Sequence, residues 1–179
     1  MKKEKHILVD ICWTLFYSNT TYDFLNIKGN WLNSLIYKLF GCDIVRSRAI
    51  RRFQAHNREE QLALAELFYN TYLEPRKIEP VWRMIEGLNV ILVSQTMDVI
   101  AEVVAKHVGA KAYHATQNKE EVLTQYTDFD IITDNISDLE LIKQAQHATI
   151  ITYNNKSRWK KLLPQDINIT FIDTGRYKY

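Results

Sequence analysis

The chain has 179 residues, of which 46% are hydrophobic and 25% are charged, a composition typical of a soluble globular protein that buries a sizeable core. Its 23 basic and 21 acidic residues leave a net charge of +2, so no strong positive field is present to hold nucleic acid, and we expect no nucleic-acid partner. Neither a run of roughly 18 apolar residues nor a secretion signal is visible, which predicts a cytoplasmic protein without a transmembrane segment. The two cysteines, Cys12 and Cys42, form no CxxC pair, and this fits a reducing compartment.

Short segments rich in isoleucine and valine, each bounded by polar or turn residues, predict buried strands. In chain order these segments are 7–9, 89–93, 130–133 and 148–152, with a candidate edge strand at 167–172. Helical patterns fall between them, at 97–108, 119–126 and 137–145, and the first of these ends at Gly109 as a C-cap. Alternation of strands and helices predicts an α/β fold, a three-layer Rossmann-like parallel sheet with helices on both faces.

The segment 19–79 interrupts this alternation, because it contains no strand candidate and its apolar residues recur at helical spacing. We expect a small all-helical cap, residues 17–84, inserted after the first strand of a core made of residues 1–16 and 85–179. The apolar stripe at 31–40 also has the pattern of a helix that lies on a membrane surface, but packing within the cap is the simpler interpretation.

Polar side chains follow three of the predicted strands at the point where each strand ends. A single aspartate in such a place is more often a turn or helix cap. Here, however, each of the three strand ends presents suitable groups, and the carboxyl ends of parallel strands meet at one edge of a sheet. The groups are Asp10 and Cys12 after the first strand, Ser94 after the second, and Asp134, Asn135 and Asp138 after the third.

This combination of groups suits a hard divalent cation and a phosphoryl group. Mg²⁺ prefers oxygen ligands and takes one or two carboxylates, leaving other positions to water and phosphate oxygens. We expect Asp10 and Asp134 as its ligands, with Asp138 or Asn135 in support. A carboxylate beside Mg²⁺ and a phosphoryl group can attack phosphorus, giving an aspartyl phosphate that water hydrolyses.

These segments resemble the haloacid dehalogenase superfamily, in its phosphoserine-phosphatase-like branch with an inserted helical cap. The family's first motif, a strand ending in Asp-x-Asp-x-Thr, stands here as Asp10-Ile11-Cys12-Trp13-Thr14. Its second motif, a strand ending in Ser or Thr, matches Ser94. Its third, a lysine from the following region, is best matched by Lys119, and its fourth, a strand followed by acids, is matched by Asp134 and Asp138.

The resemblance implies a role for each matched residue. Asp10 is the implied nucleophile, Thr14 shapes the loop behind it, Ser94 binds phosphoryl oxygens, and Lys119 neutralises the charge of nucleophile and phosphate. Mg²⁺ is bound by Asp10, the main-chain carbonyl of Cys12 and Asp134, with help from Asp138. Simpler roles stay open: Thr14 in a turn, Ser94 and Asp138 at helix starts, and Lys119 on the surface.

The chain departs from the family at Cys12, where the family has the aspartate that protonates the leaving group and then activates water. A thiol has the wrong acidity and geometry for both steps, and loss of a general acid or base typically costs about 10²- to 10⁴-fold in rate. Trp13 beside it replaces a small residue and narrows the phosphate pocket. Three explanations compete: a substrate with a good leaving group such as an acyl phosphate, a different reaction, or a catalytically degenerate protein that binds a ligand or partner.

Substrate contacts are expected from the rim residues Cys12, Trp13, Ser94 and Gln95 and from arginines in the cap. Arginine binds phosphate and carboxylate bidentately, so we predict that Arg48 and Arg52 of the cluster 46–58 face the rim, although a solvated helix face is the simpler alternative. We therefore predict a Mg²⁺-dependent phosphatase of a small phosphorylated metabolite, with a non-catalytic binding protein as the alternative. The sequence names neither the substrate nor the oligomeric state.

Overall fold

The structure is a computed structural model that describes residues 5–26, 42–163 and 167–175. The predicted apolar stripe at 31–40 lies outside these residues. Within the described ranges, no helix is both long enough and apolar enough to span a bilayer.

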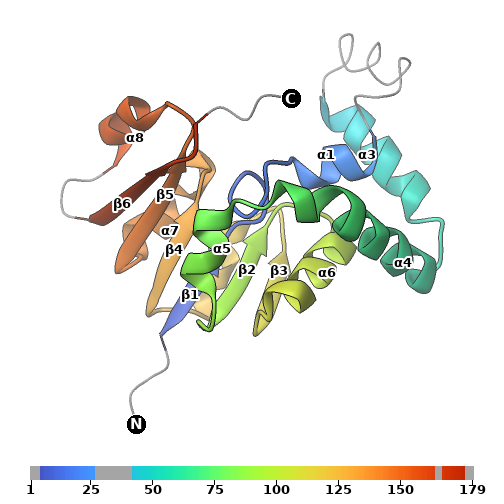
Figure 1. The fold of residues 1–179 in the computed structure, drawn as a ribbon, viewed down its shortest axis with the longest axis horizontal. Helices are drawn as coiled ribbons and strands as arrows, with labels where there is room; N and C mark the ends of the chain where they lie inside the picture. The colour runs from blue at the N-terminus through green and yellow to red at the C-terminus, as the bar shows by residue number, and fades with distance from the viewer. Residues whose placement is uncertain (1–4, 27–41, 164–166, 176–179) are drawn as a thin grey trace.

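Six parallel strands form one sheet in the order β3-β2-β1-β4-β5-β6 (Figure 1). β1 lies in the middle and pairs with β2 on one side and β4 on the other, so crossovers leave in opposite directions at this point. The residue that follows β1 therefore stands where open parallel sheets bind ligands. The strands are β1 (His6–Val9), β2 (Val90–Ser94), β3 (Ala112–Ala115), β4 (Phe129–Thr133), β5 (His147–Thr152) and β6 (Asn168–Asp173).

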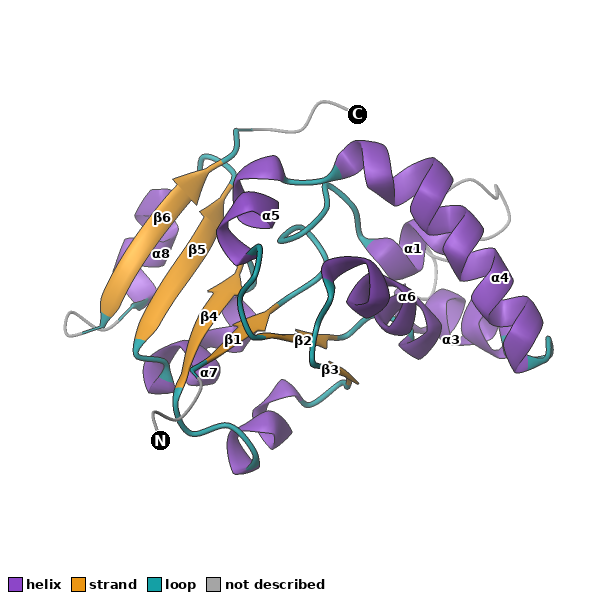
Figure 2. Ribbon diagram, turned by 60° about the horizontal axis from the view of Figure 1, so that its bottom comes forward, coloured by secondary structure: helices purple, strands orange, loops and turns teal. Residues whose placement is uncertain are grey.

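Helices cover both faces of the sheet (Figure 2). The longer ones are α3 (Cys42–Phe53), α4 (Arg58–Phe68) and α6 (Asp98–Val108), and the shorter ones are α1 (Thr20–Phe24), α5 (Glu79–Ile85), α7 (Leu139–Gln144) and α8 (Lys156–Leu162). The described residues also form a π-helical turn (Tyr69–Leu73) and three 3₁₀ helices (Glu74–Arg76, Lys119–Thr124 and Ile136–Asp138).

Successive residues of a strand point to opposite faces of the sheet, so alternate strand residues pack into two separate hydrophobic cores. Val9, Leu92 and Ile132 point to the side of α5 and α6, and their neighbours Leu8 and Ile131 point to the side of α7 and α8. The two cores and the sheet between them make three layers. The predicted three-layer α/β fold with a parallel sheet is thus confirmed.

The chain between β1 and β2 is mainly helical in its described part, and it contributes to the hydrophobic core on one side of the sheet. Phe53 of α3 and Ala65 of α4 belong to the same hydrophobic core as α5 and α6. Arg58 ties α4 to α6 by ion pairs with Asp98, at 2.6 Å, and with Glu102. The division into a core and a cap, 17–84, stays a prediction.

Candidate active site

Asp10 follows β1 directly and lies at the bottom of a cavity at the carboxyl edge of the sheet. Its side chain is only 5% exposed. One carboxylate oxygen, Oδ1, accepts a hydrogen bond from the main-chain N–H of Ile11 at 2.8 Å. The other, Oδ2, lies 3.0 Å from the ammonium nitrogen of Lys119. The two contacts hold the carboxylate in one orientation at the cavity.

Lys119 is a buried cation placed between two carboxylates. Its Nζ lies 2.9 Å from Oδ2 of Asp138, which also accepts a hydrogen bond from the hydroxyl of Thr133 at 2.6 Å. Desolvation by burial works against the charge of Lys119, but the carboxylates of Asp10 and Asp138 outweigh it and raise its pKa above the ordinary value. Lys119 is therefore a permanent positive charge beside Asp10.

Asp134, which follows β4, is joined to the loop after β1 through Thr14. The Thr14 hydroxyl donates to Oδ1 of Asp134 at 3.2 Å and accepts from the main-chain N–H of Asp134 at 3.1 Å. Burial, together with the negative charge of Asp10, raises the pKa of the Asp134 carboxyl to about 8. Two carboxyl groups thus repel each other here, and a cation placed between them would relieve that repulsion.

Ser94, the last residue of β2, has a buried hydroxyl that forms no hydrogen bond to any described residue. The residue is 1% exposed, and within the described part of the chain its Oγ has no hydrogen-bond partner. Buried hydroxyls are almost always paired in folded proteins, because an unpaired one costs about 1–3 kcal/mol. An unpaired hydroxyl facing the cavity marks a place for an oxygen atom of a ligand.

These groups share one cavity of about 410 Å³. Eight residues singled out from the sequence line it: Asp10, Cys12, Trp13, Ser94, Gln95, Lys119, Asp134 and Asn135. Asp138 and Thr14 do not line it and support Lys119 and Asp134 from behind. Side chains from the helical segment after β1 form the remaining wall, among them Tyr22 and Arg46.

Neither a family model nor a curated protein matches the sequence, but solved structures match the fold. A protein of unknown function from Bordetella pertussis Tohama I superposes with a TM-score of 0.70 over 93% of this chain and 98% of its own, at 13% identity. A HAD family hydrolase from Salmonella enterica serovar Typhi gives a TM-score of 0.58 over 96% of this chain and 67% of its own, also at 13% identity. A phosphoserine phosphatase with an analogue of a phospho-aspartyl intermediate gives 0.54 over 94% of both chains, at 15% identity.

The chain has the haloacid dehalogenase fold. At these identities the likeness concerns the arrangement of elements, and it confirms the fold that the resemblance implied. In this fold the four matched motifs lie at the ends of β1, β2 and β4 and in the 3₁₀ helix after β3.

Cys12, at the position where the resemblance leads one to expect an acid, contacts a hydroxyl of the helical segment after β1. Its Sγ lies 3.2 Å from the hydroxyl of Thr20, which in turn lies 2.6 Å from the hydroxyl of Thr96. Desolvation by burial, followed by the charge of Asp10, raises the pKa of the thiol to about 11. The group is therefore a neutral thiol at neutral pH and no substitute for a carboxylic acid.

Trp13 lines the cavity from a backbone conformation that bulky residues seldom adopt. Its φ is 55°, in the left-handed region, where a residue other than glycine usually costs about 1–3 kcal/mol. Two hydrogen bonds hold it there: its N–H donates to the carbonyl of Ser18 at 3.2 Å, and its carbonyl accepts from the hydroxyl of Tyr153. The Tyr153 ring also packs edge-on against the indole, with centroids 5.9 Å apart. The fold thus fixes Trp13 at the wall.

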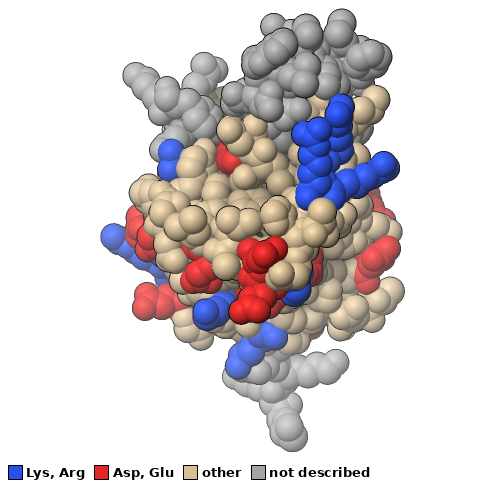
Figure 3. All heavy atoms as spheres, turned by 90° about the vertical axis from the view of Figure 1, so that its right-hand side faces the viewer, with Lys and Arg blue, Asp and Glu red and all other residues tan. Residues whose placement is uncertain are grey.

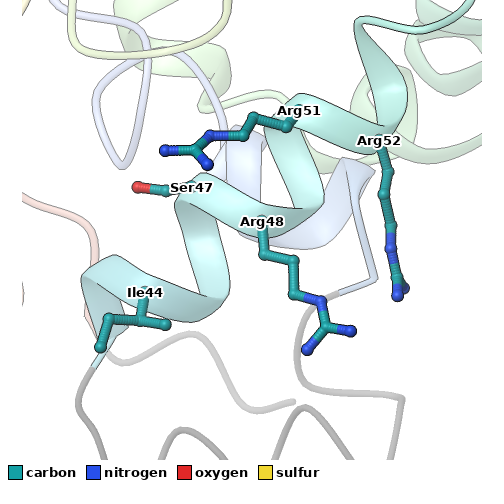
Figure 4. A pocket seen from close by; sticks show the side chains of 5 residues that line it. All are labelled: Ile44, Ser47, Arg48, Arg51 and Arg52. Atoms are coloured by element: carbon teal, nitrogen blue, oxygen red, sulfur yellow. The ribbon is translucent and has the colours of Figure 1, made fainter.

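Arg46, not Arg48 or Arg52, is the arginine that the structure brings to the cavity. Its Nη2 donates to the main-chain carbonyl of Gln95 at 2.8 Å, and its Nη1 lies 3.4 Å from the side-chain oxygen of Gln117. Arg48 and Arg52 line a separate hollow of about 640 Å³ along α3 (Figure 4). In the view onto the end formed by α3 and α4, basic side chains gather at one edge (Figure 3).

Other cavity residues were not singled out from the sequence. Thr21 and Tyr22 of α1 reach the cavity, and Asn19 before them caps that helix by accepting from the N–H of Tyr22. The segment was predicted only as helical, and no local pattern indicates which face of a short helix meets a distant strand end.

Proposed function

We propose that the chain is a phosphatase of small phosphorylated molecules that forms an aspartyl phosphate on Asp10. The observation that carries this proposal is the convergence of Asp10, Lys119, Ser94 and Asp134 in one cavity from separate segments of the chain. The fold supports it, because a phosphoserine phosphatase with an analogue of a phospho-aspartyl intermediate is among the similar structures.

The proposed roles follow from the contacts. The Asp10 oxygen attacks phosphorus, while Ile11 N–H and Lys119 hold the carboxylate in place. The unpaired Ser94 hydroxyl donates to a phosphoryl oxygen. Lys119 balances negative charge that builds up in the transition state, and Asp138 holds Lys119 in position. Positioning and charge neutralisation supply most of the acceleration in phosphoryl transfer.

The donor set at this edge fits Mg²⁺. Among the described residues, no group of three acidic, histidine or cysteine side chains is arranged to hold a metal ion. Mg²⁺ needs only one or two carboxylates and keeps several waters, so Asp10, Asp134 and the main-chain carbonyl of Cys12 would suffice to hold it. The repulsion that raises the pKa of Asp134 is what a bound cation would offset. When bound, Mg²⁺ supplies charge neutralisation at the phosphoryl oxygens.

The first test compares turnover by the wild-type chain and by Asp10→Asn, with Mg²⁺ and p-nitrophenyl phosphate or acetyl phosphate. Since the amide side chain of this variant cannot form the acyl phosphate, we expect turnover to fall by about 10³-fold or more, with unchanged circular dichroism. Asp130→Asn is the matched control, because Asp130 lies on β4 and pairs with Lys5 at 2.8 Å outside the cavity. Equal turnover by the wild-type and Asp10→Asn chains contradicts the proposal.

A second candidate function is binding without catalysis, and Cys12 is the observation that favours it. The thiol in place of the acid removes a step that typically contributes about 10²- to 10⁴-fold. That loss is smaller than the total acceleration of many enzymes, so the phosphatase remains our first proposal. Absence of turnover on a broad panel of phosphorylated metabolites, with binding of the same compounds retained, would establish the second candidate. The free Cys12 thiol is also the reason why we propose a cytoplasmic location, since thiols stay reduced there.

A further inference from the structure

Among the described residues that line the cavity, no histidine and no carboxylic acid free of another proposed role is present to protonate a leaving group. The cavity's only carboxylic acids in the described part of the chain are Asp10 and Asp134. Asp10 is the proposed nucleophile, and Asp134 is the second proposed Mg²⁺ ligand, a role that it would fill as a carboxylate and not as a protonated acid. Lys119 is held between two carboxylates. We therefore expect slow hydrolysis of substrates whose departing oxygen must be protonated. Substrates whose oxygen leaves readily as an anion should be hydrolysed faster.

Two aromatic side chains, Trp13 and Tyr22, line the cavity beside the proposed nucleophile. Trp13 lies three residues after the nucleophile and is fixed in its left-handed conformation by Ser18 and Tyr153. Tyr22 lines the cavity from α1. Aromatic rings pack favourably against other rings, in stacked or edge-on geometry, by about 0.5–1.5 kcal/mol beyond simple area burial. A flat aromatic group thus fits this wall better than a small polar one.

Resting on the phosphatase function proposed above, we propose that the substrate is an aryl phosphate, a phosphate ester of an aromatic alcohol whose ring lies against Trp13 and Tyr22. Both features of the cavity select this class. An aryl oxide leaves without an acid because its charge is delocalised into the ring, and the same ring is what the aromatic wall holds.

The reaction balances without any further reactant than water. A carboxylate oxygen of Asp10 bonds to phosphorus as the bond from phosphorus to the aryl oxygen breaks, and the aryl oxide departs with the electron pair. Water then bonds to phosphorus, and the bond to Asp10 breaks. The proton that the water loses reaches the aryl oxide through solvent. The products are the phenol and inorganic phosphate.

Comparing kcat/KM for four phosphate compounds separates the effect of the leaving group from the effect of an aromatic ring. Phenyl phosphate is aromatic and leaves readily, benzyl phosphate is aromatic but leaves as an alkoxide, acetyl phosphate leaves readily without a ring, and O-phosphoserine has neither property. We expect kcat/KM for phenyl phosphate to exceed that for benzyl phosphate by about 10²- to 10⁴-fold, the usual contribution of the missing acid. We expect Cys12→Asp to reduce that ratio at least about tenfold, because it restores a carboxylic acid.

The aromatic wall is tested with Trp13→Leu and Trp13→Phe. Trp13→Leu is expected to raise the KM for phenyl phosphate about three- to tenfold and to change that for acetyl phosphate less than about twofold. Trp13→Phe keeps an aromatic ring, so we expect it to raise the KM for phenyl phosphate less than Trp13→Leu does. Tyr22→Leu gives a second test from another element, and melting followed by circular dichroism checks that each variant is folded.

Different outcomes overturn different claims. Turnover that depends on Asp10, with benzyl and phenyl phosphate handled within about threefold of each other, overturns the leaving-group requirement. KM values that Trp13→Leu and Tyr22→Leu change equally for phenyl and acetyl phosphate overturn the aromatic contact. Absence of turnover that depends on Asp10, on all four compounds, overturns the phosphatase function itself.

Discussion

Three buried charged side chains contact one another in a row: the proposed nucleophile Asp10, then Lys119, then Asp138. Asp10 and Asp138 each lie within 3.0 Å of Lys119, and the Thr133 hydroxyl donates to the same Asp138 oxygen, Oδ2, that Lys119 contacts. Taking a charge out of water is costly, so such a group is stable only while its partners remain. Lys119 therefore contributes to stability as well as to the proposed chemistry, and the two contributions can be measured separately.

We predict that Lys119→Met lowers the free energy of unfolding by about 3–5 kcal/mol at neutral pH, because it leaves two buried carboxylates without their cation. Urea denaturation measures the change. Lys143→Met is the matched control: Lys143 pairs with Glu140 at 2.6 Å on the surface, and exposed pairs contribute at most about 1 kcal/mol. Equal losses in both variants would refute the buried-cation interpretation.

Asp134 gives the protein a distinctive dependence on pH when divalent cations are removed. Its pKa is raised to about 8 in the folded state, above the ordinary value of 3.8 in an unfolded chain. Between these values the folded state holds a proton that the unfolded state has released, so stability falls as pH rises through this window. Denaturation in EDTA at several pH values should show this fall, and Asp134→Asn should flatten it. A steeper fall in Asp134→Asn than in the wild type would be contrary to this assignment.

At the scale of single elements, α3 shows what a helical pattern can and cannot predict. Arg48 and Arg52 are four residues apart, so they share a face of any helix, and Arg46 lies on a different face. The sequence indicates this grouping but not which face meets the sheet edge. Packing of Phe53 into the core decides that, and it turns Arg46 toward Gln95. Arg48 and Arg52 line the other hollow, so their contacts with the rim remain a prediction.

We predict that Arg46→Gln raises the KM for p-nitrophenyl phosphate about tenfold, because it removes a positive charge from the cavity wall, where charge-assisted bonds to anions contribute about 1.5–3 kcal/mol. Steady-state kinetics measure it. Arg52→Gln on the same helix is the control and should leave KM unchanged, since Arg52 lines the other hollow. An increase in KM in Arg52→Gln, with KM unchanged in Arg46→Gln, would indicate that Arg52 and not Arg46 contacts the substrate.

Other elements differ from their predictions for local reasons. β3 was not predicted, because Ala112–Ala115 contains no apolar run and is only half-buried at the sheet edge. The helical pattern at 119–126 forms a 3₁₀ helix over Lys119–Thr124. Burial of Lys119 and Val122 on one side of this short piece holds it against the core. In both cases tertiary contacts outweigh a weak local signal.

At the scale of the whole molecule, the sheet order explains why so much of the candidate site was predictable. Residues after β1, β2 and β4 are far apart in sequence, but these three strands are adjacent in the order β2-β1-β4. Strand ends that alternate with helices therefore predict the gathering of Asp10, Ser94 and Asp134 without any knowledge of side-chain packing. Tyr22 and Arg46 were not predictable in this way, because they come from helices whose placement depends on packing.

We predict that Mg²⁺ stabilises the entire fold through this edge. A ligand that binds only the folded state raises its stability by about 2.7 kcal/mol at a concentration a hundredfold above the dissociation constant. Addition of Mg²⁺ should therefore raise the melting temperature of the wild-type chain, and EDTA should reverse the effect. Asp134→Asn should show a much smaller rise, whereas Asp130→Asn, altered elsewhere on β4, should respond like the wild type. A rise of equal size in Asp134→Asn would place the ion somewhere else.

The loop that carries the nucleophile is anchored to partners far ahead of it in the chain. Thr14 bonds to Asp134 across 120 residues, and the carbonyl of Trp13 bonds to Tyr153 across 140. A nascent polypeptide that ends after β3 thus already carries Asp10 but lacks these two anchors of the loop beside it. The geometry of this loop is therefore complete only after β4 and β5 have been added to the folding chain.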